Sequence, residues 1–147
     1  MIKKTIYALC FSTISLMALD TGDSIPQNIQ TQLNLESNKT YVIDFFASWC
    51  KSCKKELPLI SKVHTEQTVE VIGVNVDKKK EDGEVFVQKF AVPFRVIYDT
   101  NKEFIGAFDP VGFPALYYVR DGKIIKTIMG AVDNIDEQIA KDIKEMK

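Results

Sequence analysis

Two patterns meet in the stretch YVIDFFASWCKSCKKELP, residues 41 to 58. Its first seven residues are almost all apolar and rich in β-branched and aromatic types, which is typical of a strand buried on both faces. From Cys50 to about Thr65 the residues Cys50, Cys53, Leu57, Ile60 and His64 recur every three or four positions, which predicts a helix with one buried stripe. Pro58 lies inside this helix, and we expect it to introduce a kink.

The following segments extend this start into a sheet. Residues 69 to 76, VEVIGVNV, predict a second buried strand, so that strand, helix and strand form a parallel βαβ unit with a right-handed crossover. A second helix over residues 81 to 91 and a third strand over residues 94 to 99 come next. The second helix is expected to pack Val85, Phe86 and Phe90, or nearby neighbours, against the sheet.

The last third of the chain predicts a hairpin and a final helix. The segments ALYYV and KIIKTIM flank Asp121-Gly122, a pair that favours a two-residue turn. Asp133 is the expected N-cap of the final helix. An isoleucine then recurs every fourth residue, at positions 135, 139 and 143, which predicts an amphipathic helix lying on the sheet.

Length and charge exclude some classes of protein. A chain of 147 residues is expected to fold as one domain, and we expect a monomer. The formal net charge is −1, and the only basic run, residues 78 to 80, is followed at once by Glu81 and Asp82. We interpret this run as a solvated loop and expect no nucleic-acid partner.

The N-terminus has the pattern of a secretory signal. Lys3 and Lys4 precede an apolar run of about 14 residues, which is short for a membrane span. We expect residues 1–20 to be either a cleaved signal peptide or a retained membrane anchor, with Cys10 as a passive apolar residue. Residues 21–37 are expected to form a linker with a weak first element, and residues 38–147 the main domain.

Three kinds of site could use two cysteines at the spacing of Cys50 and Cys53. A zinc site needs four ligands, and only His64 and Cys10 could complete it. A structural disulfide across so small a loop would remove little chain entropy. A redox pair fits the position directly after a buried strand, at the start of a helix.

Redox chemistry assigns different roles to the two thiols. The helix N-terminus and Lys51 both favour an anion at Cys50, which lowers its pKa and makes it the attacking thiolate. Cys53 lies one turn further along and is expected to be less exposed, so it would resolve the mixed disulfide.

The stretch VIDFFASWCKSCKKELP resembles the active-site region of the thioredoxin superfamily. Trp49 and Pro58 stand at matching places, and GFPALYYVRDGKII matches the loop that carries a cis-proline, here Pro114 after Phe113. The resemblance implies an α/β thioredoxin-like fold, with a mixed central sheet flanked by helices. A helix-strand insertion would follow the first βαβ unit. This insertion, the residues around the cysteines and the signal-like N-terminus are most similar to those of the TlpA/ResA/CcmG group.

The resemblance also implies an activity. Proteins of this group are exported thiol-disulfide oxidoreductases, many of them reductants in cytochrome c maturation, in the periplasm or at the outer face of the cytoplasmic membrane. The expected partners are protein thiols and disulfides such as apocytochrome c, with a membrane thiol donor upstream. No cofactor or metal is expected beyond the Cys50–Cys53 disulfide. A disulfide-forming oxidant and a non-catalytic adaptor remain the alternatives.

Further candidate residues surround the pair. Asp44 is flanked by Ile43 and Phe45 on the buried strand, so a solvated position for it is hard to build. Glu56 follows Cys53 by one helical turn, and relatives in the ResA-like group carry a glutamate at this place. A buried carboxyl here would have a raised pKa and could take the proton of Cys53. The substrate-binding candidates are Trp49, Phe113 and Pro114, although core packing would also explain the two aromatic residues.

Overall fold

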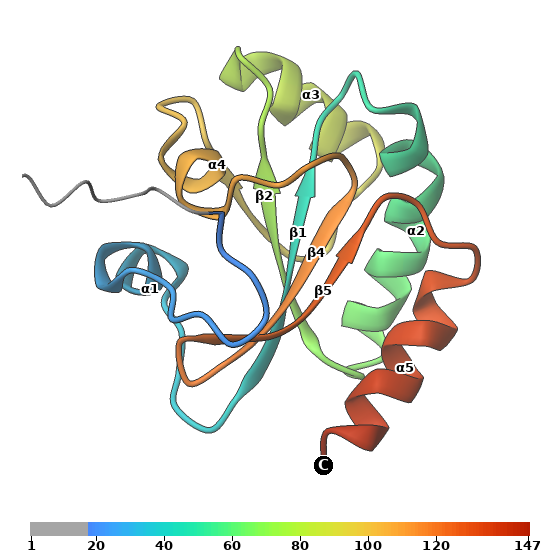
Figure 1. Cartoon of the computed structure of the whole chain (residues 1–147). Coiled ribbons are helices and arrows are strands. Elements are labelled where there is room, and N and C mark those ends of the chain that lie inside the picture. Colours follow the sequence, from blue (N-terminus) through green and yellow to red (C-terminus); the bar gives the residue numbers. More distant parts are fainter. Residues whose placement is uncertain (1–17) are drawn as a thin grey trace, which may run out of the picture.

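A five-stranded mixed sheet forms the centre of the protein in the computed structural model, which describes residues 18–147 (Figure 1). The strands are β1 (Thr40–Phe46), β2 (Glu70–Asn75), β3 (Arg95–Tyr98), β4 (Ala115–Arg120) and β5 (Lys123–Met129). Their order across the sheet is β3-β2-β1-β4-β5. The pairs β1–β2 and β2–β3 are parallel, whereas β1–β4 and β4–β5 are antiparallel.

Within residues 18–147, five helices flank this sheet: α1 (Gln27–Leu33), α2 (Lys51–Thr65), α3 (Lys80–Lys89), α4 (Glu103–Phe108) and α5 (Ile135–Glu145). Helices α2 and α5 lie together on one side of the sheet, and α1 and α4 lie on the other (Figure 1). The pair α3–β3 is the expected helix-strand insertion, and β3 becomes the edge strand beside β2. The predicted α/β fold class is therefore confirmed.

The central strand β1 is buried because helices cover both of its faces. On one face, Phe45 packs against Phe108 of α4 and Tyr117 of β4, with ring centroids 5.1 and 5.5 Å apart. On the other face, Phe46 packs against Phe86 of α3 at 5.8 Å. The near-continuous apolar run in the sequence reflects this burial on both sides.

The tight turn between β4 and β5 confirms the hairpin prediction. Asp121 and Gly122 both have positive φ, 51° and 70°, as a type I′ turn requires. A Cβ atom at Gly122 would lie 2.2 Å from Oε1 of Gln30, so any other residue here would also displace the end of that side chain.

Several local predictions were wrong. Asp133 does not cap α5: the N-cap is Asn134, in the left-handed conformation with φ 55°, and its side chain makes no capping hydrogen bond. Val85 does not pack on the sheet, since it is 66% exposed on the outer side of α3. Helix α4 was not predicted at all. It begins where the buried carboxylate of Asp99 accepts the backbone N–H groups of Phe104 and Ile105.

The N-terminal segment contributes more than a linker. Ile25, Ile29 and Leu33 are buried in the core, and Ser24 forms a β-bridge with Lys123. The folded body therefore extends to the N-terminal side of residue 38. The predicted signal or anchor falls almost wholly on residues 1–17, outside the described residues. Within residues 18–147, no helix is long and apolar enough to cross a membrane.

Candidate active site

The two cysteines form a disulfide at the start of α2, after the short loop that follows β1. The Cα atoms of Cys50 and Cys53 are 5.3 Å apart and the sulfurs are bonded at 2.13 Å. Cys50 is the N-cap of α2, and its Sγ accepts the backbone N–H of Cys53 at 3.2 Å. Cys50 is 6% exposed and Cys53 2%, in the predicted order. Reduction would leave the Cys50 sulfur at the positive end of a 15-residue helix, where a thiolate is stabilised.

The strand before the pair and the helix that follows Cys50 each carry a buried carboxyl group. Asp44 on β1 and Glu56 on α2 are both buried. Burial, together with the nearby charge of Glu56, raises the pKa of Asp44 to about 8. The pKa of Glu56 is also raised by burial, although a hydrogen bond from the Val132 N–H to its Oε1 at 3.1 Å opposes this. Asp44 therefore holds a proton near neutral pH that an ordinary aspartate would have lost, and Glu56 is shifted in the same direction.

One carboxyl oxygen of Glu56 is available to accept a hydrogen bond or a proton. Its Oε2 is buried and has no hydrogen-bond partner among the described residues. Glu56 also lines a small pocket of about 280 Å³ between α2 and the loop before α5, with Ser52 and Lys55 at one side and Ala131 and Val132 at the other. A buried carboxylate oxygen without a hydrogen-bond partner can accept a proton from a neighbouring group.

Three apolar residues form what we call the apolar rim: Trp49, which precedes Cys50, Phe113, whose ring contacts that of Trp49, and Val111, two residues before Phe113. Trp49 is 62% exposed, which excludes plain core packing for this residue. Its ring meets Phe113 edge-on, with centroids 5.6 Å apart. The bond between Phe113 and Pro114 is cis, as predicted, and Pro114 is buried. Val111, 88% exposed and close by in the chain, is an apolar residue that sequence reasoning did not single out.

Sequence reasoning also missed the residues that hold the loop before Cys50. Ser48 makes two hydrogen bonds to Asp77, which follows β2 and is buried. The only available signal was a polar pair, Asn75 and Asp77, at the end of a strand that is otherwise apolar.

His64 takes no part in this site. It lies in the last turn of α2, partly buried as predicted, and its Nδ1 accepts the backbone N–H of Val71 at 3.2 Å. Its ring packs edge-on against Phe94. Among residues 18–147, no group of three or more histidine, cysteine, aspartate or glutamate side chains could hold a metal ion.

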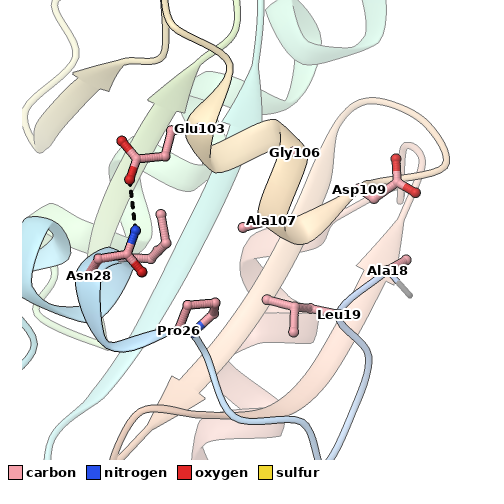
Figure 2. A pocket seen from close by; sticks show the side chains of 9 residues that line it. Ala18, Leu19, Pro26, Asn28, Glu103, Gly106, Ala107 and Asp109 are labelled. Carbon is pink, nitrogen blue, oxygen red and sulfur yellow. Dashed lines mark hydrogen bonds between the residues drawn. The ribbon is translucent and has the colours of Figure 1, made fainter. Parts of the chain in front are cut away.

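The two larger pockets lie away from the cysteines. One, of about 600 Å³, lies between α1, α4 and the segment before α1, where Asn28 donates a hydrogen bond to Glu103 at 2.8 Å (Figure 2). The other, of about 620 Å³, lies around His64 at the far end of α2. Neither contains a residue of the disulfide or its acids, so size alone would misplace the site.

Comparison with known proteins agrees with this geometry. The AhpC/TSA family model matches residues 17–128. The thiol-disulfide oxidoreductase ResA of Geobacillus thermodenitrificans (strain NG80-2) is 25% identical over 154 residues, covering 97% of this chain and 86% of that protein. The ResA of Bacillus subtilis (strain 168) is 31% identical over 98 residues, covering 64% of this chain and 55% of that protein.

A solved structure shows the same fold. A crystal structure from Chlorobium tepidum, provisionally named thiol:disulfide interchange protein DsbE, superposes with a TM-score of 0.75 at 22% identity. It covers 87% of this chain and 98% of its own. With a thioredoxin-like sheet, a disulfide at the start of α2 and these relatives, the chain belongs to the AhpC/TSA family and is a thiol-disulfide oxidoreductase.

Proposed function

We propose that the protein is an exported reductant of protein disulfides, as in cytochrome c maturation. The thiolate of Cys50 attacks a substrate disulfide, and one substrate sulfur leaves as a thiolate that takes up a proton. Cys53 then loses its proton, attacks the Cys50 sulfur and releases the second substrate thiol. Two electrons pass to the substrate, and the Cys50–Cys53 disulfide forms.

The observation that carries this direction is the pair of buried acids, Asp44 and Glu56. A dithiol is a strong oxidant in its disulfide form when the protein stabilises the reduced thiolate. The raised pKa values of these carboxyl groups support the opposite case here, because they indicate surroundings of low dielectric constant, which disfavour any buried negative charge, a thiolate included. The reduced form is thus less stabilised relative to the disulfide, which favours a reductant.

The remaining parts of the proposal rest on the resemblance to the ResA-like group. We propose apocytochrome c or another exported protein as the substrate, and a membrane thiol donor as the source of electrons. The signal-like N-terminus supports a location in the periplasm or at the outer face of the cytoplasmic membrane. The exposed apolar rim of Trp49, Phe113 and Val111 supports a protein rather than a small molecule as substrate.

Equilibration with glutathione buffers tests the direction of electron flow. We expect the Cys50–Cys53 couple to have a reduction potential near that of thioredoxin, roughly −270 mV, because the acids disfavour the thiolate. The fraction of reduced protein is measured by alkylation and mass spectrometry. A potential near roughly −120 mV would instead identify a disulfide-forming oxidant. Insulin reduction with catalytic turnover is expected as well, and its absence would identify an adaptor.

Replacing Glu56 by glutamine is expected to slow resolution of the mixed disulfide at least about tenfold, which corresponds to about 1.4 kcal/mol of lost transition-state stabilisation. Cys53 must lose its proton as it attacks, and Glu56 lies one turn away with a free oxygen. In the parent, resolution should accelerate as the pH rises through the raised pKa of Glu56, since only the carboxylate accepts a proton. The Glu56→Gln variant should lose this pH dependence.

Stopped-flow measurement separates this step from formation of the mixed disulfide, which should change less than about twofold because Cys50 attacks without Glu56. Glu66→Gln is the matched control, since Glu66 is an exposed glutamate at the other end of α2. Parental pH profiles for both steps in Glu56→Gln would show that Glu56 does not carry the proton and would leave Asp44 as the candidate.

A further inference from the structure

The loop that carries Trp49 and Cys50 is tied to the loop after β2 by one buried carboxylate, Asp77. Its Oδ2 accepts the backbone N–H of Ser48 at 2.9 Å, and its Oδ1 accepts the Ser48 hydroxyl at 2.8 Å. Ser48 stands one residue before Trp49 and two before Cys50. A carboxylate that binds both the main chain and the side chain of one residue fixes its orientation as well as its position.

Asp77 is itself held from the sheet. Asn75, the last residue of β2, donates from Nδ2 to Asp77 Oδ2 at 2.7 Å, and its Oδ1 accepts the Asp77 backbone N–H at 3.3 Å. Gly83 of α3 packs so closely on Asn75 that a Cβ atom there would lie 2.1 Å from the Asn75 Oδ1. Glycine at position 83 therefore leaves the room that the Asn75 amide occupies, and the hydrogen bonds run from the end of β2 to the active-site loop.

The loop has few other constraints at this point. Cys50 donates its backbone N–H to the Ala47 carbonyl at 3.1 Å, which closes a turn around Ser48 and Trp49. Trp49 is largely exposed and meets Phe113 only edge-on. The loops that hold Ser48 and Asp77 begin at the same end of the sheet, because the parallel strands β1 and β2 both end there (Figure 1).

We propose that Asp77 is a positioning residue of the active site, which holds Ser48 so that Trp49 and Cys50 face an incoming protein disulfide. The inference rests on thiol–disulfide exchange at Cys50 and not on the direction of electron flow. Its consequence depends on the size of the substrate. A protein must fit its surface to the rim at Trp49, whereas a small disulfide needs only the Cys50 thiolate, which the start of α2 stabilises without Asp77.

Three substitutions separate the hydrogen bonds from the charge. Asp77→Ala removes every side-chain contact to Ser48 and Asn75. Ser48→Ala removes the hydroxyl contact and keeps the backbone one. Asp77→Asn retains the shape: its amide oxygen can accept from the Ser48 backbone and Asn75, while its NH₂ group donates to the Ser48 hydroxyl.

The measurement compares the rate constants of the reduced variants with insulin and with 5,5′-dithiobis(2-nitrobenzoate), a small disulfide. For Asp77→Ala we expect the rate with insulin to fall at least about tenfold and the rate with the small disulfide to change less than about twofold. Ser48→Ala should lie between parent and Asp77→Ala, and Asp77→Asn should recover most of the insulin rate. Iodide should quench the fluorescence of Trp49, the only tryptophan of the chain, more strongly in Asp77→Ala than in the parent.

Asp99→Ala is the matched control. Asp99 is a buried aspartate after β3 that also accepts two N–H groups, at 3.0 and 2.8 Å, but they belong to α4. Its loss should lower the melting temperature and leave the ratio of the two rates and the Trp49 quenching unchanged. The proposal is overturned if Asp77→Ala keeps the parental ratio and quenching, or if Asp99→Ala changes them equally. If Asp77→Ala does not fold, Ser48→Ala decides by the same ratio. A failed glutathione potential would count against the proposed reductant and not against this role of Asp77.

Discussion

A Cys50→Ser variant is expected to lose thiol–disulfide exchange, with the rate of insulin reduction falling by at least about 10³-fold. Cys50 caps the positive end of α2 and is the more exposed of the two sulfurs, so no other group replaces it as the attacking thiolate. A Cys53→Ser variant should still attack but cannot resolve. It should therefore accumulate a mixed disulfide between Cys50 and its substrate.

Intact-mass spectrometry after incubation with a disulfide substrate measures the mixed disulfide directly. Both variants should stay folded, because a disulfide between residues three apart constrains the unfolded chain only slightly. Circular dichroism melts check this. Accumulation of the mixed disulfide in Cys50→Ser in place of Cys53→Ser would reverse the two roles and contradict the argument from the helix N-terminus.

An Asp44→Asn variant in the oxidised form is expected to be more stable than the parent above pH 8 and nearly equal to it below pH 4. Burial raises the pKa of Asp44 from 3.8 to about 8, so between these values the folded protein holds a proton that the unfolded chain has released. The stability of the parent therefore falls as the pH rises through this window. Each pKa unit corresponds to about 1.4 kcal/mol, so a shift from 3.8 to about 8 sets an upper limit of roughly 6 kcal/mol for the full effect.

Thermal unfolding across pH 4 to 9 measures this difference. For a domain of this size, a gain of about 3 kcal/mol raises the melting temperature by roughly 10 °C. Asp142→Asn is a control of opposite sign. Burial alone would raise the pKa of Asp142, but hydrogen bonds from Lys126, Tyr118 and Gln138 lower it. Asp142→Asn should therefore lose stability near neutral pH and approach the parent in acid. An Asp44→Asn profile parallel to the parent would show that Asp44 titrates normally.

The βαβ unit, the β4–β5 hairpin and the position of the cysteines could be predicted from the sequence because their signals are local. Burial on two faces selects an unbroken apolar run, and a two-residue turn selects Asp121 and Gly122. The burial of Asp44 was also readable from its neighbours Ile43 and Phe45. Helix α4 could not be predicted from the sequence, because it is short and its first turn is held by the side chain of Asp99, which follows β3. The functional roles of the acids and of the rim stay predictions.

The sequence alone determined which residues could carry redox chemistry, and the tertiary structure decided what surrounds them. Trp49 meets Phe113 and Ser48 meets Asp77 across 64 and 29 residues of chain, and Val132 donates to Glu56 from 76 residues away. No local pattern encodes these pairs, since each depends on sheet order and helix packing. The parallel pairing of β1 with β2 brings their carboxyl ends together, and only there can Asp77 reach the loop before Cys50.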